Sequence, residues 1–372
     1  MRTVSLYVHI PFCERRCPYC TFYHVPKTDR AMETRLVEGL IGEFRIAGAD
    51  LGRQFQIPTV YFGGGTPSLL DHRSFEILID EISPFLTAGS VEITVESNPE
   101  DVNERLMQNL SGIGVNRLSL GIQSMSSRAQ NVLKRCTPRS NEQAVRIAKR
   151  YFQNISLDLL LGIPGGTARE LEESLAAVDR FEPQHVSVYC LEPGGVIPPD
   201  TDDFFDRVDM ERAADEYLLV CDRLRTRGFG HYEVSNFARS GFESRHNKVY
   251  WNGGEYLGIG PSAHSFIEGE RYSNVPSIDQ YLAEWPMFPR TVRRHEVRGE
   301  TERRLEEIML DLRTSVGTPL DRLKCNPRLV DELVDEDLAS IVEERLVLTD
   351  RGYLVLNEIV HRLSGGPWAA SA

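Results

Sequence analysis

Residues 7–20 read YVHIPFCERRCPYC, in which Cys13, Cys17 and Cys20 stand within eight residues of one another. They follow an apolar, β-branched stretch at residues 4–10 that predicts a first strand. Three thiolates at this spacing can hold three corners of a [4Fe–4S] cluster, and the missing fourth ligand leaves one iron open for a small molecule. A structural zinc with His24 as its fourth ligand is the competing interpretation.

Strand-like and helix-like segments alternate through the first part of the chain. Six short β-branched runs stand at residues 4–10, 59–62, 91–95, 117–120, 155–161 and 185–190. Helical patterns lie between them, such as Leu171, Leu175 and Val178 at i, i+4 and i+7. This alternation predicts a parallel sheet with right-handed crossovers. Because six units are too few for a closed eight-strand barrel, we expect an α/β fold with a partial, open (βα)6 TIM-like barrel at residues 1–230.

Polar or glycine residues mark the ends of these predicted strands. The first strand runs into the cysteine loop and the second into GGGTP at residues 63–67, and the next two are followed by Glu96 and Gln123. The fifth carries Asp158 in an apolar run, where an unpaired carboxylate would be costly. Chemistry in parallel barrels gathers at the carboxyl ends of the strands. The pattern therefore favours a cluster beside a bound small molecule, because a structural zinc would not need this ring of groups.

The rest of the chain differs in character. Residues 231–295 are rich in Gly, Tyr, Asn and Ser, which predicts a connecting region of loops and short hairpins. A helical pattern resumes near residue 300, and the tail LVLTDRGYLVLNEIVHRL predicts a β-hairpin around residues 350–352 followed by a helix. We therefore expect a small α+β, winged-helix-like domain at residues 296–372.

The charge balance argues against broad classes of partner. The 372 residues include 42 basic and 55 acidic ones, for a net charge of −13, a sign that repels phosphate backbones and anionic lipid. Residues 331–344 hold seven acidic and no basic residues, unlike a DNA-binding face. The sequence shows no secretory signal and no apolar run long enough to span a membrane, so we expect a cytoplasmic protein that binds no nucleic acid and is not integral to a membrane.

Several motifs together carry a specific resemblance. Cys-x3-Cys-x2-Cys after the first strand, with GGGTP after the second, resembles the radical S-adenosylmethionine (SAM) superfamily. Within it, YVHIPFC, GGGTPS, ESNP, GIQS, VLKR and LDLLLGIPG resemble the coproporphyrinogen III oxidase-like family, and the similarity extends over essentially the whole chain. The resemblance implies a [4Fe–4S] cluster on Cys13, Cys17 and Cys20, with the methionine part of SAM on the open iron.

The resemblance also implies which residues hold the cofactor. Tyr7 and Tyr19 would flank the cluster and SAM. The remaining SAM-binding residues would be Gly64, Gly65 and Thr66 at the methionine end, and Glu96, Gln123, Arg135 and Asp158 along the rest of the pocket.

Two branches of this family share these motifs. The oxygen-independent coproporphyrinogen III oxidase, which decarboxylates two propionates of its substrate, carries a fourth cysteine two residues after the third and an N-terminal extension. Here Phe22 takes that position, and only six residues precede Tyr7. Both differences resemble the other branch, the haem chaperone (HemW-type) group.

That branch is also marked by the motif HNxxYW, which stands here at residues 246–251. Because imidazole is a common axial ligand of haem iron, the resemblance makes His246 the best candidate for a haem contact, with His264 second. Arg245 could pair with a propionate. A loop histidine capped by its aromatic neighbours is the alternative.

We therefore expect a radical SAM protein of haem metabolism that takes up haem as cargo and passes it to apoproteins. The oxidase is the first alternative, and a zinc-site or nucleic-acid-binding protein the next. The cluster needs an electron donor. The sequence is compatible with use of the radical in turnover and with a role for the cluster in gating haem transfer. It is also compatible with a homodimer and with membrane association during haem delivery.

Overall fold

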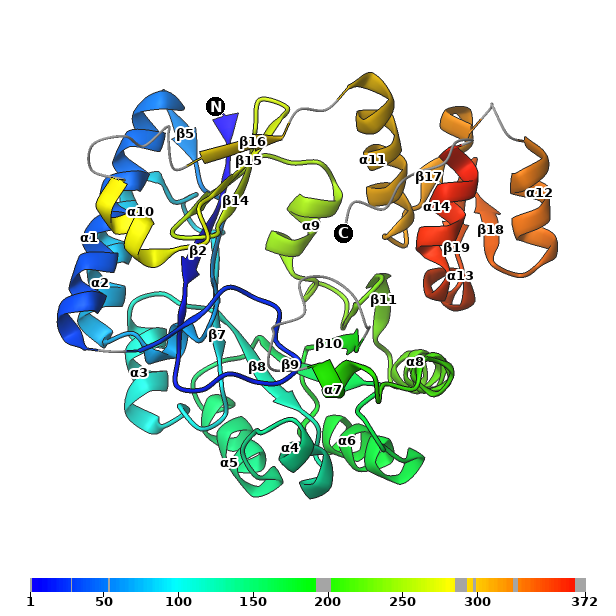
Figure 1. Cartoon of the computed structure of the whole chain (residues 1–372), viewed down its shortest axis with the longest axis horizontal. Helices are drawn as coiled ribbons and strands as arrows, with labels where there is room; N and C mark the ends of the chain where they lie inside the picture. Colours follow the sequence, from blue (N-terminus) through cyan, green and yellow to red (C-terminus); the bar gives the residue numbers. More distant parts are fainter. Residues whose placement is uncertain are drawn as a thin grey trace.

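The computed structural model describes residues 2–27, 29–52, 54–191, 202–284, 293–296, 299–323 and 327–364. Six parallel strands form the centre of its large sheet and follow the predicted runs (Figure 1). They are β2 (Ser5–Ile10), β6 (Thr59–Gly64), β7 (Glu92–Ser97), β8 (Arg117–Gln123), β9 (Ile155–Leu161) and β10 (His185–Cys190). Each strand pairs with the next one along the chain, and the sheet stays open, which confirms the predicted partial barrel.

Helices cover the outer side of these strands (Figure 1). They are α1 (Arg30–Asp50), α2 (His72–Ile82), α3 (Glu104–Gly112), α4 (Ser127–Val132), α5 (Pro138–Ala148), α6 (Ala168–Phe181) and α8 (Met210–Thr226), with the short α7 (Asp202–Phe205), η1 (Pro67–Leu69) and η2 (Ser83–Phe85) between them. Capping side chains start most of them: Asp29 accepts the Met32 amide, and Thr167 forms a capping box with Glu170. Each helix then buries one apolar face against the sheet.

The connecting region contributes to the main sheet. Its strand β13 (Tyr256–Ile259) pairs in parallel with β2, so seven parallel strands lie side by side. The sheet continues through the antiparallel strands β14 (His264–Ile267), β15 (Glu270–Asn274) and β16 (Arg293–Glu296), and its other edge carries β12 (Asn236–Ala238) and β11 (Gly230–Glu233). A Cβ on Gly258 would lie 2.1 Å from the carbonyl oxygen of His264, so the close approach of β13 to the start of β14 requires glycine there.

Two helices complete this region. Helix α9 (Arg245–Trp251) carries the HNxxYW motif, and α10 (Ile278–Glu284) packs against α1. The Ser244 side chain caps α9 by accepting the amide of Asn247. The region contains the antiparallel pair β14 and β15, and β13 and these helices add more regular structure than composition indicated.

The C-terminal residues form a small α+β unit beside the barrel (Figure 1). It comprises α11 (Glu300–Leu312), β17 (Thr318–Pro319), η3 (Leu320–Leu323), α12 (Pro327–Asp335), β18 (Ala339–Val342), β19 (Arg345–Leu348), α13 (Asp350–Leu354) and α14 (Leu356–Ser364). The prediction of a β-hairpin around residues 350–352 was wrong. The turn lies at Glu343 and Glu344, both with positive φ, and Thr349 instead caps α13 by accepting the amide of Gly352.

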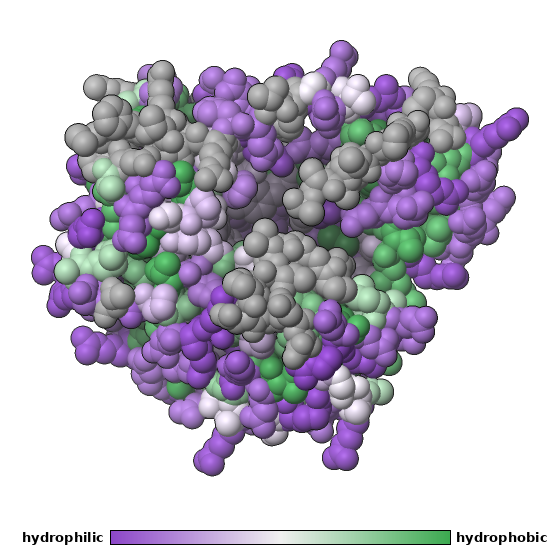
Figure 2. Space-filling view, viewed as in Figure 1, coloured by the Kyte–Doolittle hydropathy of each residue, from purple (hydrophilic) through white to green (hydrophobic). Residues whose placement is uncertain are grey.

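The molecular surface is hollowed between the barrel strands and the C-terminal elements (Figure 2).

Two short parallel pairs lie outside the large sheet: β1 (Arg2–Thr3) with β5 (Phe55–Gln56), and β3 (Phe12–Cys13) with β4 (Val25–Pro26). Among the described residues, no helix combines the length and apolar character needed to cross a bilayer.

Candidate functional site

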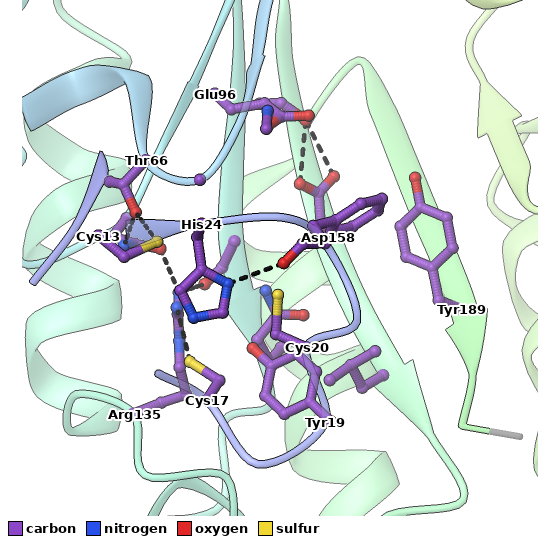
Figure 3. Close-up of a pocket in the computed structure, with 18 of the residues that line it drawn as sticks. Cys13, Cys17, Tyr19, Cys20, His24, Thr66, Glu96, Arg135, Asp158 and Tyr189 are labelled. Carbon is purple, nitrogen blue, oxygen red and sulfur yellow. Dashed lines mark hydrogen bonds between the residues drawn. The ribbon is translucent and has the colours of Figure 1, made fainter. Parts of the chain in front are cut away.

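The cysteine loop begins where β2 ends and is closed by the parallel pair β3 and β4. The amide of Lys27 donates to the carbonyl of Cys13 at 3.1 Å, and the amide of Cys20 donates to the carbonyl of Cys17 at 3.1 Å. All three cysteines are free thiols. The backbone therefore folds this segment so that its three sulfur atoms line one cavity (Figure 3).

That cavity, of about 440 Å³, lies at the carboxyl ends of the parallel strands. A volume of this size suits one small ligand. Among its lining residues are eleven that the sequence analysis assigned to the cluster and SAM: Cys13, Cys17, Tyr19, Cys20, Gly64, Gly65, Thr66, Glu96, Gln123, Arg135 and Asp158. Residues far apart in the chain meet here because the ends of parallel strands share one edge of the sheet.

The glycine loop, residues 63–67, begins at the end of β6 and packs tightly against the end of β2. A Cβ on Gly64, whose φ is +113°, would lie 2.6 Å from a ring carbon of His9, and a Cβ on Gly65 would lie 2.6 Å from the carbonyl oxygen of Phe12. The amide of Thr66 donates to that same carbonyl at 2.7 Å. The Thr66 hydroxyl lies 3.4 Å from the sulfur of Cys13. The glycines thus bring bare backbone beside the thiols.

Two carboxylates face the cavity from β7 and β9. Glu96 accepts a hydrogen bond from the Tyr61 hydroxyl at 2.8 Å and one from the Gly64 amide at 3.2 Å. Asp158 accepts hydrogen bonds from Ser119 and Ser156. Burial, together with the nearby Asp158 carboxylate, raises the pKa of Glu96 to about 7, and burial also raises the pKa of Asp158. The two carboxylates suit a cationic ligand, because a positive charge beside them would lower their pKa values and favour their ionised forms.

Arg135 connects the cysteine loop to two strand ends. One guanidinium nitrogen donates to the side chain of Asn98 at 2.7 Å and to the carbonyl of Gly121 at 2.6 Å, and the other lies 3.7 Å from the sulfur of Cys17. Gln123, at the end of β8, has a φ of +60° and follows an irregularity in the β8–β9 register. The irregularity ends the regular pairing where the strand reaches the cavity.

The spacing of the possible ligand atoms bears on the choice between a cluster and a single zinc ion. Across the described parts of the chain, the one group of at least three His, Cys, Asp or Glu residues with ligand atoms within 4.8 Å of one another is Cys221, His231 and Asp350. The three loop cysteines and His24 do not form such a group. Zinc–sulfur bonds of about 2.3 Å would put neighbouring ligand atoms about 3.8 Å apart. The wider spread of the loop thiols suits a multi-iron cluster.

Burial also affects the state of these thiols. It raises the pKa of Cys20 to about 11 and raises the pKa of Cys13. In the metal-free loop these side chains therefore hold their protons at neutral pH, and binding a metal cluster would release them.

Two residues assigned by resemblance do not line the cavity. Tyr7 lies beside it: its hydroxyl is 3.2 Å from Nδ1 of His9, and its ring stacks on Tyr61 at 6.2 Å. His246 is fully buried, with Nδ1 2.8 Å from the Thr59 hydroxyl and Nε2 2.8 Å from the Tyr250 hydroxyl. Burial lowers the pKa of His246 to about 3, so the ring is neutral.

Sequence reasoning missed three residues that shape the cavity. Tyr61 and Tyr189 both line it, and Asn98 holds Arg135. Asn98 stands in the ESNP motif at a strand end, which was an available signal. Each tyrosine belongs to an apolar strand, where the sequence alone indicates packing.

Comparison with known proteins places this geometry in context. Residues 7–178 match the model of the radical SAM superfamily. The structure is similar to that of coproporphyrinogen III oxidase (HemN) from Escherichia coli, described as a radical SAM enzyme, with a TM-score of 0.83 and 20% identity over 98% of this chain and 90% of that one. At this identity the likeness concerns the fold.

Curated relatives match at higher identity. A haem chaperone HemW from Lactococcus lactis is 32% identical, over 96% of this chain and 96% of its own. A haem chaperone HemW from Bacillus subtilis is 33% identical, over 95% and 97%. The mitochondrial radical S-adenosyl methionine domain-containing protein 1 of Bos taurus is 33% identical, over 95% and 82%.

Proposed function

The chain belongs to the HemW family of radical SAM proteins, and from this membership we propose that it binds haem and transfers it to apoproteins. The match to relatives named haem chaperones over nearly their whole length carries this proposal. The radical SAM family implies a [4Fe–4S] cluster and SAM as cofactors. When bound, a reduced cluster of this kind supplies an electron to the sulfonium of SAM.

Within this proposal, the residues around the cavity hold and shield the cofactors. Cys13, Cys17 and Cys20 ligate the cluster, and the glycine loop presents backbone groups to the methionine end of SAM. Glu96 and Asp158 balance the positive charge of SAM. The other assigned residues lining the cavity are Tyr19, Thr66, Gln123 and Arg135. Their packing excludes water from the reactive centre.

The second candidate is the coproporphyrinogen oxidase, which is favoured by the likeness of the folds. Phe22 argues against it, because it stands where the oxidase branch carries a fourth cysteine. The contact of haem with His246 stays a prediction. In the arrangement seen here both of its ring nitrogens are engaged, so that contact would require the hydrogen bond to Thr59 or the one to Tyr250 to break.

The proposed function also implies a cellular location and protein partners. We propose that the protein works in the cytoplasm and associates with a membrane when it delivers haem to a membrane-bound acceptor. A reducing protein would donate electrons to the cluster. A homodimer would show as a doubled mass in solution.

One experiment separates the two candidates. The full chain is reconstituted anaerobically with iron and sulfide, and the same sample is titrated with haem by Soret absorbance and assayed for coproporphyrinogen decarboxylation. The chaperone proposal expects saturable haem binding and no decarboxylation. Decarboxylation with weak haem binding would reverse the order, and stoichiometric zinc without iron would rule out both.

A further inference from the structure

His24 lies on the cysteine loop and lines the same cavity as the three thiols, and the proposed cofactor contacts do not use it (Figure 3). Its Nδ1 is 2.8 Å from the carbonyl oxygen of Phe22. Because a carbonyl can only accept, Nδ1 carries the proton, and in the neutral ring Nε2 then holds the lone pair. Within the described parts of the chain, no hydrogen bond or ion pair engages Nε2. A backbone carbonyl that fixes Nδ1–H in this way is the usual support of a metal-ligating histidine.

Two aromatic side chains are exposed at this same cavity. Phe22 is 69% exposed and Tyr189 is 43% exposed, and both line it. Among the large apolar side chains exposed in the described residues, these two are the aromatic ones. Phe22 comes from the cysteine loop and Tyr189 from the end of β10. Exposed aromatic surface of this kind is suited to cover a flat, apolar ligand.

The space available places such a ligand at the mouth of the cavity. About 440 Å³ suits a single small molecule, and SAM takes this interior in the proposed function. The loop also carries two cations, Arg15 and Arg16. Arg15 lines the cavity and pairs with Glu100, and Arg16 is exposed. The Arg15 guanidinium at this cavity suits a propionate of a porphyrin.

We propose that Nε2 of His24 is an axial ligand of haem iron, with the macrocycle lying against Phe22 and Tyr189 at the mouth of the SAM cavity. This inference rests on the proposed function and gives the cargo a location. His24 offers a ring nitrogen that has no partner among the described residues and lies beside exposed aromatic surface, whereas His246 is fully buried with both nitrogens bonded. Bound haem would also cover the cofactor and slow its exchange with solvent.

The test compares histidine variants of the full chain by haem titration. His24→Gln removes the ligand, His24→Met supplies a thioether in its place, and His246→Gln tests the buried alternative. His72→Gln is the matched control, because His72 lies on α2 and pairs with Glu76 away from the cavity. Each protein is titrated with and without the reconstituted cluster, and its iron content is measured, so that loss of the cluster cannot imitate loss of haem.

We expect His24→Gln to weaken haem binding by about tenfold to a hundredfold and to shift the Soret band. His24→Met should recover binding with a thioether-type spectrum, and His72→Gln should behave as the wild type. Wild-type affinity and spectrum in His24→Gln would overturn the assignment, as would a loss confined to His246→Gln. If the wild-type protein bound no haem in any of these titrations, the proposed function itself would fail.

Discussion

Tyr61 stacks on His246 with ring centroids 5.1 Å apart and an interplanar angle of 30°, while its hydroxyl donates to Glu96 in the cavity. One side chain therefore joins the proposed cofactor site to the helix that carries the HNxxYW motif. The contact lies inside the barrel, where neither partner is free to reorient without the other.

Tyr61→Phe removes the hydroxyl and keeps the stacked ring. Glu96 then loses a donor that stabilises its charged form, so we expect SAM affinity at neutral pH to fall about tenfold, with little change in folding stability. Isothermal titration of the reconstituted protein measures this. Tyr151→Phe is the matched control, since its hydroxyl donates to Glu104 on the surface at 2.7 Å. Equal effects of the two substitutions would contradict the role of Tyr61.

SAM binding should depend on pH through Glu96. Its pKa of about 7 means that the carboxylate becomes charged as the pH rises through neutrality. SAM carries a sulfonium cation, so its affinity should increase about tenfold from about pH 6 to about pH 8. Glu96→Gln should bind more weakly and lose this dependence. A pH profile that is unchanged in Glu96→Gln would assign the titration to another group.

Gly64→Ala should disturb the glycine loop. The new Cβ would meet the His9 ring at 2.6 Å, and φ at this position is +113°, so we expect a loss of about 3 kcal/mol in the free energy of unfolding and weaker SAM binding. Gly89→Ala is the control: its φ is +73°, and nothing lies within 4 Å of the new Cβ. That variant should lose only about 1 kcal/mol. Chemical denaturation compares them, and equal losses would show that crowding at Gly64 is unimportant.

Asp350 attaches the C-terminal unit to the barrel. It pairs with Arg225 of α8 and lies 2.9 Å from Nδ1 of His231, and these partners lower the pKa of Asp350. A lowered pKa stabilises the fold above the unfolded value of about 3.9, and the contribution disappears as the pH falls through the folded value.

We therefore expect Asp350→Asn to be less stable than the wild type at neutral pH, with faster proteolysis of the C-terminal unit. The difference should shrink as the solution is acidified. Asp337→Asn removes only an exposed pair with Arg351 at 3.9 Å and should have little effect. A difference between Asp350→Asn and the wild type that grew on acidification would reverse this assignment.

Much of the cavity could be predicted because its residues stand at the ends of parallel strands. The cysteine loop, the glycine loop, Glu96 and Asp158 each follow or close an apolar run, and the topology brings such ends together. Arg135 needed the family resemblance, because it lies in the loop between α4 and α5 and nothing in the local sequence marks an arginine that reaches back to a strand end.

Other features could not be read from local pattern. Strand β13 spans only Tyr256–Ile259, and its partner β2 lies at the far end of the sequence. The residues after Thr349 have strand-like composition, but its hydroxyl caps a helix. The burial of His246 depends on Thr59 and Tyr250, and the first of these lies almost two hundred residues earlier in the sequence.

The central claim is that Cys13, Cys17 and Cys20 hold a cluster whose fourth iron is open to SAM in this cavity. Electron–nuclear double resonance on the anaerobic, reduced protein tests it directly, with SAM isotopically labelled in its amino and carboxylate groups. The account predicts coupling between these labelled atoms and the cluster, and loss of the signal in Cys17→Ala but not in Cys221→Ala. A cluster whose spectrum does not respond to SAM, because a protein side chain occupies the fourth iron, would contradict it.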